Sequence, residues 1–238
     1  QALIGSDIPA AIVTFPVVRV DDGLDTFIQI ANTDQAQIRA AQCFYINGLG
    51  ECSISGAPCL VNFDCPGGLA GEQCIPNWVE TNFFIDFTAQ QPLGWQASVG
   101  LQFEPCDPMQ VGQGAQPTCG DLAQSNGQGG VTAVSAPFRG FLTCVGIEGI
   151  NDTAPSNANV FIGTATVITG DPLDSYTYNG IGIQAEESVG TDQHLCLGGA
   201  ADTTCPDAEY AGCPQTLLMN HLFDNSFIPS VNGGTTVT

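Results

Sequence analysis

Lysine is absent from the 238 residues, and the only arginines are Arg19, Arg39 and Arg139. A nucleic-acid binder neutralises phosphates with clustered lysines and arginines, so three arginines spread along the chain exclude that class. The missing primary amine also excludes P-loop phosphate transfer and Schiff-base catalysis by lysine. We therefore expect no nucleic-acid partner.

Long apolar runs are also missing. The longest candidate, residues 10–20, is interrupted by Thr14, Pro16 and Arg19, whereas a membrane helix needs about 20 consecutive apolar residues. We therefore predict no membrane insertion. The sequence starts with Gln1 rather than Met, from which we infer removal of a signal peptide and an extracellular or cell-surface location.

The composition is acidic but typical of a folded chain. The net charge is -21, yet 43% of the residues are hydrophobic, and the acids are scattered rather than clustered, which argues against disorder. At this length we expect one domain over residues 1–238.

Cysteine is abundant, with 11 residues, which favours an oxidising destination. No pair has C-x-x-C spacing and only two histidines are present, so disulfides are a better explanation than zinc or haem. The odd count leaves at least one thiol free or in an intermolecular bridge. The predicted disulfide residues are Cys43, Cys52, Cys59, Cys65, Cys74, Cys106, Cys119, Cys144, Cys196, Cys205 and Cys213.

Runs rich in Val, Ile, Phe and Thr, separated by Gly, Pro and Asn turns, predict an all-β fold: a disulfide-stapled β-sandwich or jelly-roll-like architecture with little helix. Residues 51–74 and 106–130 interrupt this rhythm and are predicted to be long loops stapled by cysteines. One short helix is expected at residues 216–223. The expected strands are residues 11–20, 25–32, 37–47, 78–88, 95–103, 137–147, 159–169 and 176–184, the first two forming a hairpin around Asp21-Asp22-Gly23.

Two segments resemble parts of known proteins. The run CSISGAPC at residues 52–59, continued by DCPGG at 64–68 and QC at 73–74, is similar to short cysteine-rich segments of secreted proteins from Gram-negative bacteria. The run DTFIQIANTD at residues 25–34, leading to Phe44 and Tyr45, resembles the opening hairpin of bacterial surface β-sandwiches. The resemblance implies a secreted bacterial β-protein and carries over no catalytic residue.

The sequence contains few residues or motifs of the kinds that carry catalysis. His194 and His221 are the only imidazoles, and Cys196 beside His194 belongs to a cysteine cluster in which a disulfide is the simpler fate. No G-x-S-x-G motif occurs. A carboxylate pair at Glu186 and Glu187 leaves a secreted hydrolase as a minor alternative, and we predict no catalytic residue and no required cofactor.

Calcium is the metal ion that so many carboxylates favour, because Ca²⁺ prefers six to eight oxygen ligands. The candidate residues are Asp21, Asp22 and Asp25 on one tight turn, with Asp171 and Asp174 elsewhere. A solvated acidic surface explains the same residues without a metal. Asn151 begins an N-x-[ST] sequon and is a candidate glycosylation site.

Aromatic residues suggest an alternative function. Trp78, Trp95, Tyr176 and Tyr178 could stack on sugar rings in a lectin-like adhesin that binds glycans, although core packing is the commoner role of aromatic residues in strands.

A structural subunit accounts for more of these features together. Residues 8–20 are apolar on both faces yet contain Pro9 and Pro16, which suits a strand at a sheet edge. Such a strand can complete the sheet of a neighbouring copy. We therefore predict a homopolymer, a filament or sheath, built by strand addition. The predicted assembly residues are Ile8, Ala10, Ile12, Phe15, Val17 and Val18.

Overall fold

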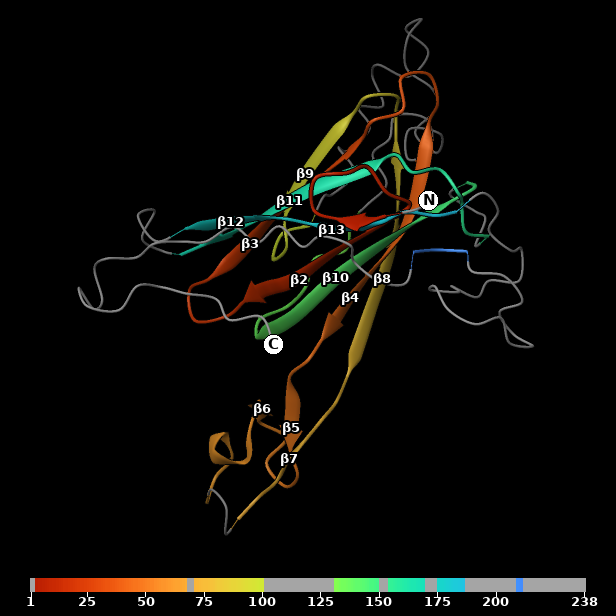
Figure 1. Cartoon of the computed structure of the whole chain (residues 1–238). Helices are drawn as coiled ribbons and strands as arrows, with labels where there is room; N and C mark the ends of the chain where they lie inside the picture. The colour runs from red at the N-terminus through yellow and green to blue at the C-terminus, as the bar shows by residue number, and fades with distance from the viewer. Residues whose placement is uncertain are drawn as a thin grey trace, which may run out of the picture.

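The computed structural model describes residues 3–67, 71–100, 131–149, 154–169, 175–186 and 209–211. Within these ranges, two antiparallel sheets pack face to face, and a third, smaller sheet projects beyond one end of them (Figure 1). The predicted all-β, disulfide-stapled sandwich is confirmed. In the described ranges the one helical element is the 3-10 turn η1 (Asn62–Asp64), and no helix there has the length and apolarity to cross a membrane.

Sheet A contains six strands in the order β1 (Ile4–Gly5), β13 (Ile181–Ile183), β2 (Ile12–Val20), β10 (Phe138–Ile147), β4 (Arg39–Asn47) and β8 (Val79–Phe87). Sheet B contains four strands in the order β12 (Tyr176–Asn179), β11 (Phe161–Ile168), β3 (Asp25–Asn32) and β9 (Pro92–Gln96). The third sheet is formed by β6 (Pro58–Cys59), β5 (Gly50–Cys52) and β7 (Cys74–Ile75).

The main core lies between sheets A and B. Strands β3 and β11 alternate buried and more exposed residues, as expected of strands with one face on a core. Aromatic rings join the two layers, with Phe83 of sheet A packed edge-on against Trp95 of sheet B. The Trp95 indole N–H donates to the buried Tyr45 hydroxyl over 2.7 Å, so the polar atom of the indole is satisfied inside the core.

A disulfide ties together two central strands of sheet A. Cys43 of β4 and Cys144 of β10 stand directly opposite each other in the pairing register and are bonded across a sequence separation of 101. Both residues are buried in the main core, so this bond holds strands that are far apart in sequence.

The turn between β2 and β3 is as predicted, but the hairpin beyond it is not. Asp22 and Gly23 both have positive φ, and Asp21 and Leu24 exchange two backbone hydrogen bonds around them, which is the geometry that Asp-Gly favours. The two strands then separate into different sheets. The buried Thr26 hydroxyl takes the place of a backbone partner for Arg19, because it accepts a hydrogen bond from the Arg19 N–H and donates one to the Arg19 carbonyl.

Strand β2 lies inside sheet A and not at its edge, contrary to the prediction. It pairs with β13 on one side and β10 on the other. Pro16 is accommodated by a bulge. Phe15 pairs with Leu142 and Val18 pairs with Gly140, so β2 has one more residue than β10 between these two pairs. Beside it, the Tyr178 hydroxyl of sheet B accepts from the Val17 N–H and donates to the Val17 carbonyl.

Two other strand predictions are corrected. The strand predicted at residues 95–103 is β9, which begins three residues earlier and ends at Gln96. The strand predicted at residues 176–184 is divided into β12 in sheet B and β13 in sheet A. The chain crosses between the sheets at Gly180, where a Cβ atom would lie 2.7 Å from the Val13 side chain, so only glycine fits there without a shift. The predicted loop 106–130 and helix 216–223 lie outside the described residues.

Asp86 of β8 gives the sandwich a pH dependence that can be measured. It is 5% exposed, and burial raises its pKa from 3.8 to about 6. Since the folded pKa is above the unfolded one, the folded state is penalised as the pH rises from about 4 through 6. We expect Asp86→Asn to stabilise the protein at pH 7.5 by up to about 3 kcal/mol, at 1.36 kcal/mol per pKa unit, and to change little at pH 3.5.

Denaturant unfolding at the two pH values measures this difference. Glu80→Gln, which neutralises an exposed carboxylate of the same strand, is the matched control and should have little effect at either pH. An equal effect of Asp86→Asn at both pH values would contradict a role for the carboxylate charge.

Candidate assembly surface

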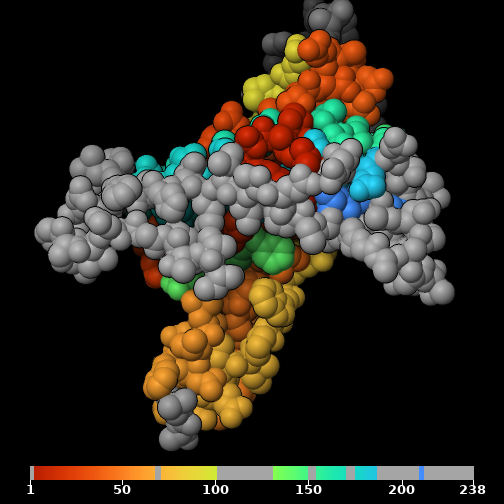
Figure 2. Space-filling view, viewed as in Figure 1, coloured from red at the N-terminus to blue at the C-terminus, as the bar shows by residue number. Residues whose placement is uncertain are grey.

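The segment predicted as a stapled loop at 51–74 is a structured projection. We call residues 48–78 the arm; it leaves the sandwich at the end of β4 and returns at the start of β8 (Figure 1). The space-filling view shows it as a lobe standing clear of the sandwich (Figure 2). The arm therefore offers surface on several sides.

Two disulfides form the interior of the arm. Cys52 bonds to Cys65 and Cys59 bonds to Cys74, and all but Cys74 of these residues are buried in a cluster with Ala57 packed against it. A segment of this length cannot build a large apolar core, and small domains compensate with disulfides. The arm thus holds its shape by cross-links, while six of its large apolar side chains are left exposed.

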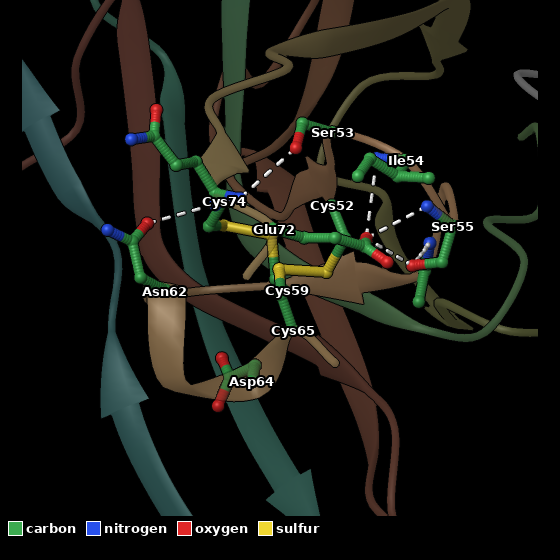
Figure 3. Close-up of a disulfide and its surroundings, with 12 residues drawn as sticks. Cys52, Ser53, Ile54, Ser55, Cys59, Asn62, Asp64, Cys65, Glu72 and Cys74 are labelled. Atoms are coloured by element: carbon green, nitrogen blue, oxygen red, sulfur yellow. Dashed lines mark hydrogen bonds between the residues drawn. A yellow bond between two sulfur atoms is a disulfide. The ribbon is translucent and has the colours of Figure 1, made fainter. Parts of the chain in front are cut away.

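Two carboxylates, Glu72 and Asp64, accept hydrogen bonds within the arm, and Figure 3 shows those of Glu72. Glu72 accepts hydrogen bonds from the Ser55 hydroxyl at 2.6 Å, the Ser55 N–H at 2.8 Å and the Ile54 N–H at 3.3 Å. Asp64 accepts from the Leu60 and Val61 N–H groups. These bonds lower the pKa of both carboxyl groups. The largest contribution comes from the Ser55 hydroxyl for Glu72 and from the Leu60 N–H for Asp64. Two of the arm's three carboxylates are therefore used internally.

Large apolar side chains gather on the outside of the arm. Among the described residues, six of the eleven exposed large hydrophobic residues lie in the arm, and a seventh, Val79, begins β8. Ile54 is 83% exposed and Phe63 is 71% exposed. Exposed apolar patches on folded proteins often mark interaction sites. The six residues of the arm are Ile54, Leu60, Val61, Phe63, Ile75 and Trp78.

All three arginines are occupied by pairing with aspartates. Arg39 binds Asp34, and Arg19 and Arg139 converge on the buried Asp21 carboxylate. Burial acts to raise the pKa of Asp21, but the two guanidinium groups outweigh it and hold that pKa below its usual value. Arg139 also pairs with Asp22 at 2.7 Å. The exposed surface therefore carries the negative charge of the remaining acids without a free arginine to offset it.

The predicted calcium residues Asp21, Asp22 and Asp25 do not converge on one point. Asp21 and Asp22 face arginines, whereas Asp25 accepts from the Ser98 hydroxyl and from the Thr26 N–H. In the described part of the chain, the only three metal-ligand side chains close together are Cys52, Cys59 and Cys65, which are engaged in disulfides. Asp171 and Asp174 lie outside the described residues, and calcium stays a prediction.

The predicted assembly residues lie mostly inside the sandwich. Ala10, Ile12, Phe15 and Val18 are buried; Ile8 is half-buried and Val17 is exposed at the bulge. Ala10 exchanges two backbone hydrogen bonds with Phe161 of sheet B. To reach a neighbouring copy, this segment would have to leave its own partners.

The predicted sugar-binding aromatics do not form one surface. Trp95 is 2% exposed in the core, and Tyr178 is held on the Val17 backbone. Tyr176 and Tyr178 stack on each other with ring centroids 6.5 Å apart. Trp78 alone of the four is well exposed, at 66%.

Several predicted residues are outside the described ranges and keep their status as predictions. Six of the predicted disulfide cysteines are bonded as described above. The residues without a description are Cys106, Cys119, Cys196, Cys205, Cys213, Asn151, His194, His221 and Glu187.

Sequence reasoning missed the exposed apolar residues of the arm. A signal was present, because Ile54, Leu60, Val61 and Phe63 stand between closely spaced cysteines, where cross-links leave little room to bury them.

Comparison with known proteins finds no protein family, no curated protein and no solved structure that matches this chain.

Proposed function

We propose that this protein is an extracellular structural subunit, exported by a bacterium, that assembles with copies of itself into a filament or sheath. The observation that carries the proposal is the arm, a cross-linked projection with six large apolar side chains facing solvent. The three disulfides support an oxidising environment. The bacterial origin rests on the two sequence resemblances.

The arm is a better contact element than the N-terminal strand. Strand addition by residues 8–20 would require β2 to leave both β13 and β10, at the centre of sheet A. The arm needs no such rearrangement, because its shape is fixed by its own disulfides and its apolar side chains are already exposed. Contacts made without unfolding avoid the ordering cost of a newly released segment.

Assembly through the arm should respond to salt in a characteristic direction. Copies with a net charge of -21 repel one another at low ionic strength, and the Debye length falls from about 30 Å at 0.01 M salt to about 3 Å at 1 M. We therefore expect the assembled fraction to rise with NaCl, whereas an interface of ion pairs would weaken.

Substitution of Phe63 tests the proposal. Phe63→Asp should raise the concentration needed for assembly by about tenfold or more, since it puts a charge in an apolar contact. Sedimentation velocity in high salt measures the assembled fraction, and thermal unfolding verifies the fold. The matched control is Ile38→Asp, an exposed apolar position away from the arm. Equal assembly of Phe63→Asp and the wild-type protein would contradict the proposal.

A glycan-binding adhesin is the second candidate, and Trp78 is the residue that supports it. Its ring packs beside Gly48, at the base of the arm, and remains largely exposed, as a sugar-stacking platform requires. Saturable binding on a glycan array that is lost in Trp78→Ala would favour this function over self-assembly.

A further inference from the structure

The outer face of sheet B contains a groove of about 460 Å³. Its floor is formed by two cross-strand pairs of β3 and β11, Gln29 with Thr164 and Ala31 with Ile162. Ser6 and Asp7, in the segment after β1, form part of its wall. Asp7 is the one ionisable residue in this lining, so the groove is nearly uncharged in a strongly acidic chain.

The arm of the same molecule does not occupy this groove. Near its base the arm meets the sandwich around a separate hollow, lined by Leu60 and Asp64 of the arm and by Asp22 and Arg139 of the sandwich. None of these residues lines the groove. Figure 1 shows the arm beyond the end of the sandwich, away from β3 and β11. The arm of the same molecule therefore leaves this groove unfilled.

We propose that the groove on the outer face of sheet B receives the arm of a second copy of this chain. This inference rests on the proposed function and names the surface that the arm contacts. The arm presents apolar side chains, and the groove presents Ala31 and Ile162 among uncharged polar side chains with a single carboxylate, so neither surface brings many charges into the contact. A contact between them leaves most carboxylates of both copies in water, where their repulsion is screened.

Charge argues against a basic protein as the occupant of the groove. A basic protein would be drawn to the exposed carboxylates, since all three arginines of this chain are already paired. The arm and groove are different surfaces, so each copy can use its groove for one neighbour and its arm for another. Such a heterologous contact builds open chains, whereas a contact of arm with arm would close at a dimer.

Charged substitutions in the groove test this pairing. Ala31→Glu should raise the concentration needed for assembly by about tenfold or more. Gln29→Glu, at an exposed position that leaves the core untouched, should act in the same direction and decides the question if Ala31→Glu folds poorly. The matched control is Gln96→Glu, the same substitution at an exposed position in the sheet outside the groove, and it should assemble normally.

Mixing two defective variants gives the sharpest result. Phe63→Asp has an intact groove and Ala31→Glu an intact arm, so an equimolar mixture should form heterodimers that cannot grow further. Sedimentation velocity distinguishes these from monomers and polymers. If both groove variants assemble like the wild-type protein while Phe63→Asp does not, the groove assignment is wrong and the proposed function stands. If the wild-type chain stays monomeric at high salt, both are wrong.

Discussion

Replacing Cys43 and Cys144 together by alanine is expected to lower the free energy of unfolding by about 4–5 kcal/mol. Their bond spans a sequence separation of 101, and closing a loop of about 100 residues in the unfolded chain is worth about 4.7 kcal/mol in the chain-entropy model. Both residues are also buried in the main core, so the lost sulfur atoms add a packing cost. Denaturant unfolding measures the change.

The arm disulfides provide the control for this prediction. Cys52 and Cys65 are separated by 13 residues, for which the same model gives about 3 kcal/mol. Because these residues lie in the arm, their replacement by alanine should loosen the arm while the sandwich unfolds at nearly its original denaturant concentration. An unfolding midpoint unchanged by the Cys43 and Cys144 double substitution would show that this bond does not support the sandwich.

Trp95→Ala is expected to destabilise the protein by about 3–5 kcal/mol, the range for removing a buried tryptophan. The substitution empties a space beside Phe83 and leaves the buried Tyr45 hydroxyl without its Trp95 donor. Trp78→Ala is the matched comparison, because Trp78 is exposed. It should change stability by less than about 0.5 kcal/mol while reducing assembly.

The Trp95→Ala and Trp78→Ala variants distinguish three roles of aromatic residues, namely core packing, assembly and sugar binding. Thermal unfolding and sedimentation of the two variants measure stability and assembly independently. A Trp95→Ala variant that keeps wild-type stability would contradict its place in the core. A Trp78→Ala variant that assembles normally but loses glycan binding would show that Trp78 belongs to a sugar site and not to the assembly surface.

Local patterns in the sequence were sufficient for most strands. Residues 37–47 alternate with period two, and β4 forms there, with Ala41, Cys43 and Tyr45 on its core face. The Asp22-Gly23 dipeptide predicts a tight turn, and both residues have positive φ. These features depend on neighbours within a few residues, which is why they can be read without a structure.

Features that depend on distant partners were not predictable. The separation of β2 from β3 into different sheets depends on their pairing with β10 and β11, which lie far along the chain. The interior position of β2 depends on pairing with β10 and β13, more than a hundred residues away in sequence, and on a bulge that accommodates Pro16. Two prolines in an apolar run were therefore mistaken for the mark of an edge strand.

The candidate site was missed for a related reason. Four cysteines within residues 52–74 predicted a stapled loop, and the structure confirms the staples. The sequence alone did not show that the disulfides would fill the interior of the arm and leave Ile54 and Phe63 in solvent. Which side of a small cross-linked segment is exposed depends on the disulfide connectivity, which spacing does not determine.

The most direct test of the central claim is electron microscopy, after negative staining, of the disulfide-intact wild-type chain in buffer with high salt. A structural subunit that assembles through its arm should form filaments or sheath-like layers, and these should be lost in Phe63→Asp and retained in Ile38→Asp. Single separate particles at every salt and protein concentration would contradict the claim that this chain works by assembling with copies of itself.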